Sequence, residues 1–224
     1  MHRIHYRFGL VLGLILAALA FGLAAPEGDG ARFVGVSLQA ATLVAAVVAS
    51  RAHRWIVRLS VLAAVVGVVG TAAALVGTNE FGDGSAAIVA LCYVLLTPPA
   101  IVSGLIKHFR EEGEVTLQMM FGVLCLYLLV GLLFGVGYAA IQEISDEPFF
   151  TTGEGQRDDF LYFSYATLTT VGYGDLIAAT DVGRSLAITE ALVGQIYLVT
   201  VVAVIVSNLR PARPRSRRRQ AGAE

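Results

Sequence analysis

The 224-residue chain has few charged residues and almost no cysteine. Asp, Glu, Lys and Arg make up 15% of the sequence, whereas a soluble domain carries about 25%. This shortage excludes a water-soluble globule and a disordered tail, and the formal net charge of -1 gives no basis for a nucleic-acid partner. Cys92 and Cys125 each lie in an apolar run without metal-like spacing, which excludes a disulfide scaffold.

Long apolar runs make up most of the sequence. Hydrophobic residues make up 56% of the chain, and a helix needs roughly 20 of them to cross a hydrocarbon core about 30 Å thick. Six stretches qualify, and each is apolar on all sides, as expected of helices that face lipid or one another. The sequence therefore predicts an all-α membrane protein with six transmembrane helices, at residues 8–25, 33–50, 55–76, 85–106, 115–141 and 185–209.

Basic residues gather on one side of the predicted membrane. Thirteen of the 16 precede the first span, join the second to the third and the fourth to the fifth, or follow the sixth. The positive-inside rule then places both termini in the cytoplasm of a multi-pass cell-membrane protein, which an even number of spans allows. An alternative concerns the N-terminus, because basic residues, an apolar run and Leu23-Ala24-Ala25 also resemble a cleavable signal.

The connection between the fifth and sixth spans differs from the others. Residues 142–159 are acidic and predict an exposed outer loop. Residues 160–169 are apolar but too few to cross the bilayer, which predicts a short re-entrant helix. Asp158 and Asp159 occupy the positions of an N-cap and a first-turn acid for this helix.

Non-helical backbone follows the short helix in Thr170-Val171-Gly172-Tyr173-Gly174-Asp175. Such backbone is tolerated at membrane depth only where protein buries it or a watery path needs it. Glycines at alternate positions allow φ above zero, and this alternation turns successive carbonyls to the same side. A row of carbonyls facing an axis replaces the water around a dehydrated cation.

The segment from Thr169 to Asp175 resembles the signature of potassium channels, and Val204-Ile205-Val206-Ser207-Asn208 resembles the end of the inner helix of voltage-gated members. The resemblance covers residues 115–208 and implies a six-helix type with one pore loop, as in bacteria. It divides the chain into a four-helix transmembrane region (1–110), a pore domain (111–209) and a basic cytoplasmic tail (210–224). One filter per chain supplies a quarter of a pore, so closed symmetry predicts a homotetramer.

The resemblance also implies roles for the filter residues. K⁺ would bind the backbone carbonyls of Thr170, Val171, Gly172 and Tyr173, with the Thr170 hydroxyl completing the innermost site. Gly174 would shape the outer mouth.

Three further positions would support the filter. Asp175 would lie behind it and accept a hydrogen bond from an aromatic residue of the short helix, for which Tyr162 is the candidate. Thr169, the first residue of the potassium-channel signature, is the third of these supporting positions. Potassium channels commonly have a proline soon after the aspartate, but this chain has Ala178 there. The resemblance therefore does not determine the shape of the outer mouth.

Two features of the sixth span each have two interpretations. Gly194, Leu198, Val202 and Val206 share one helical face, either as a pore face with a bend at Gly194 and a dewetting gate below, or as ordinary packing that a small residue permits. Glu190 is the one acid within a span core. It is either a pH-sensitive group behind the filter or a residue hydrogen-bonded to Thr or Tyr neighbours.

The four leading spans lack the residues of a voltage sensor. Gating by voltage requires intramembrane basic residues, and no Arg or Lys lies between Leu59 and Ile106. The fourth span contains Thr97-Pro98-Pro99, which should kink or break it. The basic tail either meets anionic lipid headgroups or only fixes the topology.

The first functional hypothesis is a passive K⁺-selective channel, with K⁺ as the permeant ion, no organic cofactor, membrane lipids as partners and no soluble ligand domain. The alternatives are a nonselective cation channel of the same architecture or a transporter, although no internal repeat indicates the latter. An enzyme is not expected, because the spans lack convergent titratable groups, a phosphate loop and a nucleophile constellation.

Overall fold

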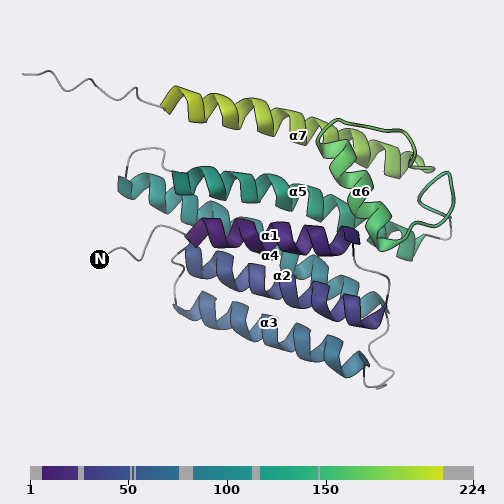
Figure 1. The fold of residues 1–224 in the computed structure, drawn as a ribbon, viewed down its shortest axis with the longest axis horizontal. Helices are drawn as coiled ribbons and strands as arrows, with labels where there is room; N and C mark the ends of the chain where they lie inside the picture. The colour runs from purple at the N-terminus through teal and green to yellow at the C-terminus, as the bar shows by residue number, and fades with distance from the viewer. Residues whose placement is uncertain are drawn as a thin grey trace, which may run out of the picture.

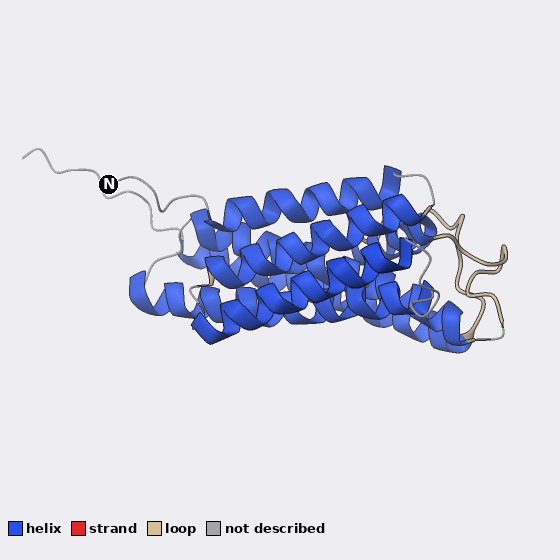
Figure 2. Cartoon of the chain, turned by 90° about the horizontal axis from the view of Figure 1, so that it is seen from below, coloured by secondary structure: helices blue, strands red, loops and turns tan. Residues whose placement is uncertain are grey.

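The computed structural model describes residues 7–24, 28–50, 52, 54–75, 83–112, 117–145 and 147–208. Within these residues the chain forms long helices whose axes run nearly along one another, and the long described loops lie together at one end (Figures 1 and 2). The helices are α1 (Arg7–Ala24), α2 (Asp29–Ala49), α3 (Arg54–Leu75), α4 (Asp83–Glu112), α5 (Leu117–Ile144), α6 (Arg157–Leu168) and α7 (Asp181–Asn208).

Each predicted span coincides with one long helix, and α6 lies where the short helix is expected. Two segments, Arg54–Ala73 and Gln118–Ile144, are long and apolar enough to cross a membrane by length and composition. Shorter apolar segments occur at Phe8–Ala24, Phe33–Ala49 and Cys92–Lys107. Six crossings therefore remain a prediction, with six long helices in place to make them.

The direction of the helices agrees with an even number of crossings. The start of α1 and the end of α7 lie at the same end of the bundle, and the loops that flank α6 lie at the other end (Figure 1). The predicted basic tail, 210–224, lies outside the described residues.

Helix α5 is the centre of the packing. It contacts α1, α4, α6 and α7, whereas α7 contacts only α5 and α6 among the described helices. A buried cluster joins α1, α4 and α5 through Phe8, Val11, Ile15, Ile101, Cys125 and Leu129. Helices α1 and α4 are thus packed directly on α5, and α7 lies at the edge, with one side uncovered by the described part of the chain.

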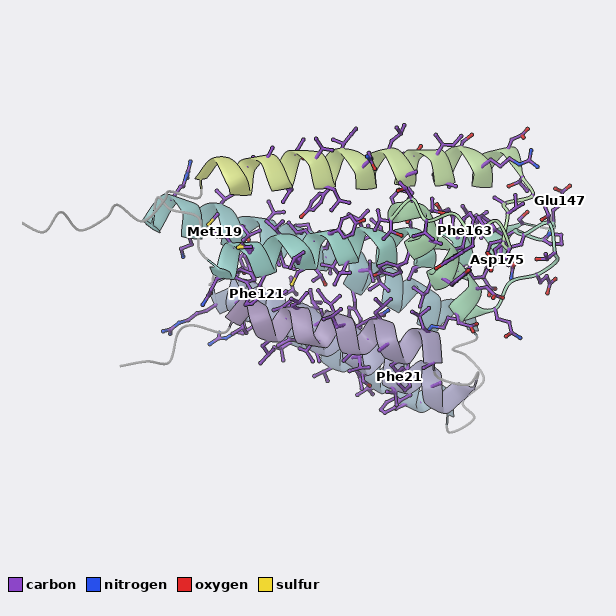
Figure 3. All side chains as sticks on the ribbon, turned by 45° about the horizontal axis from the view of Figure 1, so that its top comes forward. Phe21, Met119, Phe121, Glu147, Phe163 and Asp175 are labelled. Carbon is purple, nitrogen blue, oxygen red and sulfur yellow. The ribbon has the colours of Figure 1, made fainter. Side chains whose placement is uncertain are left out.

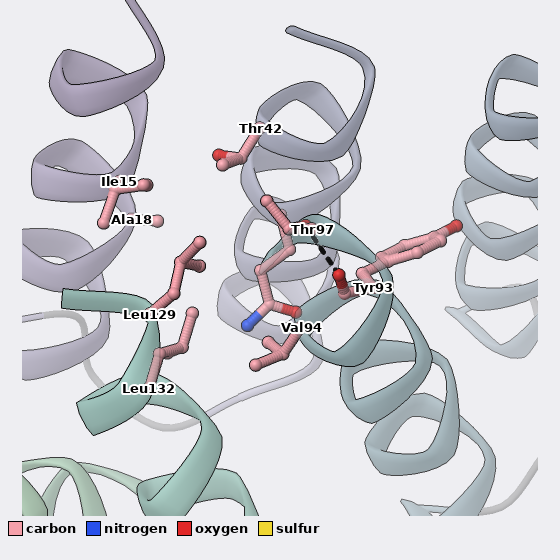
Figure 4. A pocket seen from close by; sticks show the side chains of 9 residues that line it. Ile15, Ala18, Thr42, Tyr93, Val94, Thr97, Leu129 and Leu132 are labelled. Atoms are coloured by element: carbon pink, nitrogen blue, oxygen red, sulfur yellow. Dashed lines mark hydrogen bonds between the residues drawn. The ribbon is translucent and has the colours of Figure 1, made fainter. Parts of the chain in front are cut away.

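The two prolines of α4 do not break it. Of the predicted kink or break, the break is absent, because the helix continues through Pro98 and Pro99. The Thr97 hydroxyl donates to the Tyr93 carbonyl oxygen at 2.7 Å. A cavity of about 10 Å³ lies beside this turn, between α1, α2, α4 and α5 (Figure 4). This volume is at the lower limit for one water molecule, so the cavity is too small for an organic ligand.

Candidate functional site

Helix α6 begins with a capping arrangement that lies two positions before the predicted one. The N-cap is Gln156, not Asp158, and the Gln156 backbone N–H donates to the Asp159 carboxylate at 2.9 Å. Asp158 and Asp159 both lie in the first turn, where negative charge favours the positive end of the helix dipole.

Glycines of α5 let α6 lie close against it. A Cβ on Gly131 would stand 2.7 Å from the Tyr165 ring, and one on Gly135 would stand 3.0 Å from the Leu161 side chain. Both distances are shorter than van der Waals contact, so larger residues would push the two helices apart. The short helix is therefore held against α5 by shape before any polar contact is counted.

In the loop after α6, the backbone N–H groups of residues 170–172 point back toward the end of α6. The N–H groups of Thr170, Val171 and Gly172 donate to carbonyls near the end of α6, at 2.9, 2.9 and 3.1 Å. Their acceptors are Thr167 for the first and Ala166 for the other two. In the described part of the chain no hydrogen bond ends on a carbonyl of residues 170–174, and these residues are exposed. The loop thus offers a run of free acceptor oxygens.

Backbone angles alternate along this loop. The φ values of Thr170, Gly172 and Gly174 are 59°, 53° and 82°, while Val171 and Tyr173 between them are not in the positive region. The glycines adopt the angles that the sequence predicted for them. Thr170 was not expected to do so, because a β-branched residue with positive φ is strained. Strain of this kind persists where the surrounding structure imposes it, commonly at functional sites.

Two aromatic contacts hold the end of the loop. The predicted hydrogen bond is present, with the Tyr162 hydroxyl donating to the Asp175 carboxylate at 2.8 Å. The Tyr162 and Tyr173 rings stack with centroids 6.1 Å apart and planes 7° apart. Because the hydroxyl donates to the charged form, it lowers the pKa of Asp175 below its ordinary value. The Thr169 hydroxyl donates to the Tyr165 carbonyl at 2.6 Å.

The outer loop is not wholly exposed, which corrects the sequence prediction for residues 142–159. Phe149 and Phe150 are buried and belong to an aromatic cluster with Tyr138, Phe160 and Phe163. Backbone hydrogen bonds join this loop to the segment after residues 170–175, from Thr151 N–H to the Ile177 oxygen (2.9 Å) and from Ala179 N–H to the Phe149 oxygen (2.8 Å). Figure 3 shows Phe163 and Asp175 at this end of the bundle, where Glu147 also lies.

Helix α7 separates the residues that the sequence placed on one face. Gly194 is buried, and a Cβ there would collide with the Leu168 carbonyl oxygen at the end of α6. This close approach favours the packing interpretation at Gly194, and α7 continues through this position as one helix. Leu198 is 41% exposed. The Val202 and Val206 side chains lie outside the described residues.

Gln195 is a polar residue within the sixth predicted span that the sequence analysis did not single out. It lies midway along α7 and is exposed, while the nearby hydroxyls of Thr189 and Thr200 donate to their own helix. The signal was an amide in the middle of an apolar span, which is unfavourable against lipid.

Glu190 is fully buried. Its carboxyl group contacts the Tyr138 hydroxyl of α5, at 2.7 Å, and the Ser164 hydroxyl of α6. The hydrogen-bonded interpretation is therefore correct as to geometry, with Tyr138 as one of the partners. Neither Tyr138 nor Ser164 was identified from the sequence, because 52 and 26 residues separate them from Glu190.

Comparison with known proteins places a family domain over this region. Residues 123–210 match the Ion_trans_2 family model, described as "Ion channel". The chain contains an ion channel domain. Over these residues the match supports the prediction of a channel and not that of an enzyme. The domain covers α6 and α7, the loop between them and most of α5.

Curated relatives agree with this assignment. The chain is 36% identical to "Two pore potassium channel a" of Oryza sativa subsp. japonica over 107 residues, 46% of this chain and 26% of that protein. It is 33% identical to "Two pore potassium channel b" of the same plant over 99 residues, 44% of this chain and 25% of that protein. The chain thus spans about a quarter of the length of these relatives, and a six-helix bacterial type is not among them. No solved structure matches.

Proposed function

We propose that this channel protein conducts K⁺ selectively and passively as a homotetramer in the cell membrane. The observation that carries the proposal is the loop 170–174, whose carbonyls are exposed and without hydrogen bonds in the described chain. Its alternating φ angles are compatible with successive oxygens that face one side. Similarity to two plant potassium channels supports K⁺ as the ion.

Four copies are required because the loop of one chain supplies only one of the four walls of the pore. Among the described helices only α5 and α6 contact α7, and its remaining side carries Ile188, Leu192, Ile196 and Val199, each more than half exposed. Gly194 faces the end of α6. Viewed along the axis of α7, Leu198 and then Gln195 lie at increasing angles from Gly194, on the side away from α5. We place these two side chains, with Val202 and Val206 below, along the ion path.

The orientation and the remaining regions belong to the same proposal. Both termini lie in the cytoplasm, so the filter loop lies near the outer surface and the basic tail near the inner headgroups. Residues 1–110 surround the pore without acting as a voltage sensor.

The decisive experiment is reconstitution of the purified chain in liposomes, with K⁺ on one side and Na⁺ on the other. A K⁺-selective pore gives a reversal potential that follows the K⁺ gradient. A reversal potential near zero supports the nonselective alternative, which shares the fold. Native mass spectrometry of the same sample should show four chains, and a stable monomer or dimer that still conducts K⁺ contradicts the assembly.

A further inference from the structure

A buried polar contact joins the three helices of the pore domain behind the filter. Glu190 of α7 contacts the hydroxyls of Tyr138 on α5 and Ser164 on α6. The Ser164 hydroxyl also contacts the Gly131 carbonyl of α5, at 2.6 Å. Glu190 and Ser164 are both fully buried, so no exchange with bulk water compensates for a missing hydrogen bond.

The number of hydrogens at this site fixes their arrangement. Each close oxygen–oxygen contact needs one hydrogen between the two atoms. Tyr138 supplies the hydrogen for its contact with Glu190. Ser164 has a single hydroxyl hydrogen but makes two contacts, with Gly131 and with Glu190. Since the Gly131 carbonyl has no hydrogen to give, Ser164 must donate to it, and the hydrogen in the Ser164–Glu190 contact must come from Glu190.

We infer that Glu190 is a neutral carboxylic acid that donates to Ser164, which in turn donates to Gly131, so that one proton positions α6 against α5 and α7. Glu190 is thus a positioning residue for the filter loop. The protonation state stands on the geometry alone, whereas the consequence for ion flow rests on the proposed function.

The surroundings agree with a neutral acid. In the described chain the titratable groups that interact electrostatically with Glu190 are Tyr138 and Tyr127 of α5 and Tyr165 of α6. The Tyr127 and Tyr165 hydroxyls donate to the Leu168 and Leu128 carbonyls, at 3.3 and 2.6 Å. The basic residues of α6 and α7 in the described chain, Arg157 and Arg184, lie at or near the starts of these helices. In the described chain no cation is among the groups that interact with Glu190, and a carboxylate buried without one is unfavourable.

Loss of this proton has a defined structural consequence. An ionised Glu190 accepts hydrogen bonds from both Tyr138 and Ser164 and leaves the Ser164–Gly131 contact without a hydrogen. Two oxygens 2.6 Å apart then repel each other, and α6 loosens from α5. Alkaline pH should therefore disturb the filter through a group that no ion touches.

Infrared difference spectroscopy of the full-length protein in lipid tests the protonation state without any ion flux. We expect the C=O stretching band of a protonated carboxylic acid at neutral pH, shifted in D₂O and absent in Glu190→Gln. Loss of a carboxylate band in Glu190→Gln, with no carboxylic acid band in the parent protein, overturns the inference. Should Glu190→Gln not fold, Ser164→Ala serves instead: the acid band should remain and move to higher frequency, because its hydrogen-bond acceptor is gone.

Flux measurements in the same liposomes test the positioning role. Glutamine donates to Ser164 and accepts from Tyr138 as the neutral acid does, so Glu190→Gln should retain K⁺ flux and lose the decline expected of the parent protein as pH rises. Glu143→Gln, on the exposed end of α5, is the matched control and should keep that decline. An unchanged alkaline decline in Glu190→Gln contradicts the role. If no variant conducts K⁺ but the acid band is present, the proposed function fails and the neutral Glu190 stands.

Discussion

Thr170 shows how single residues set the shape of the candidate filter. Its φ of 59° is strained for a β-branched side chain, at roughly 1–3 kcal/mol. The strain is sustained by its own N–H, which donates to the Thr167 carbonyl at 2.9 Å. Gly172 and Gly174 reach similar angles without strain because they have no Cβ. The loop therefore depends on which residues are glycine.

Gly172→Ala tests this dependence at one position. Gly172 has a φ of 53° and open space where a Cβ would point, so the substitution acts through the backbone angle and not through a clash. The positive-φ conformation then costs roughly 1–2 kcal/mol, and we expect reduced K⁺ flux and weaker discrimination against Na⁺ in liposomes. Gly137→Ala, in α5 with equally open space and no positive φ, is the control and should conduct normally. Equal selectivity in both variants contradicts the prediction.

Tyr162→Phe tests the support behind the loop through pH. The Tyr162 hydroxyl lowers the pKa of Asp175, so its stabilising bond is present above the ordinary aspartate pKa and is lost as pH falls through the lowered one. Without the hydroxyl that pKa rises, and the acid-induced loss of K⁺ flux should move to higher pH. Tyr165→Phe removes a hydroxyl that donates to Leu128 instead and should not move it. If Tyr162→Phe loses K⁺ flux at the same acidic pH as the parent protein, the proposed role of this hydrogen bond is contradicted.

At the scale of helices, local patterns were readable and distant pairings were not. Apolar runs located the six long helices, and the length of the 160–169 segment located α6, because both signals lie within one stretch of sequence. The burial of Phe149 and Phe150 was missed, since it depends on pairing with residues 177–179 across α6. Gly194 was placed with Leu198 by spacing alone. Spacing assigns residues to a common face but does not identify which neighbouring helix that face meets.

Gly194→Ala tests the contact between α7 and α6. Alanine favours a helix over glycine by roughly 1 kcal/mol, yet its Cβ would collide with the Leu168 carbonyl oxygen, and overpacking costs about 1–3 kcal/mol. We expect the melting temperature of the protein in detergent to fall, and K⁺ flux to fall with it as the end of α6 is displaced. Gly70→Ala, with no atom near the added Cβ, should match or exceed the parent melting temperature. A Gly194→Ala protein that is more stable than the parent contradicts the packing interpretation.

At the scale of the whole molecule, α5 lies between two groups of helices. On one side it is packed against α1 and α4, and on the other it holds α6 and α7. The family match begins within α5 and includes none of α1–α4, so the leading helices lie outside the matched residues. Any coupling between the two regions has to pass through α5 or through the contact of α1 with α6.

Voltage steps test what the leading helices contribute. A gating charge that crosses the whole membrane field is worth about 2.3 kcal/mol per 100 mV, and no Arg or Lys lies between Leu59 and Ile106 to supply one. Arg54 and Arg58 lie in the first turns of α3, at one end of the bundle, where they sense little of the field. In planar bilayers with equal K⁺ on both sides, we expect open probability to change only weakly with voltage. A steep sigmoidal conductance–voltage curve would contradict this expectation, and neutralising Arg54 and Arg58 together would then show whether these two residues carry the charge.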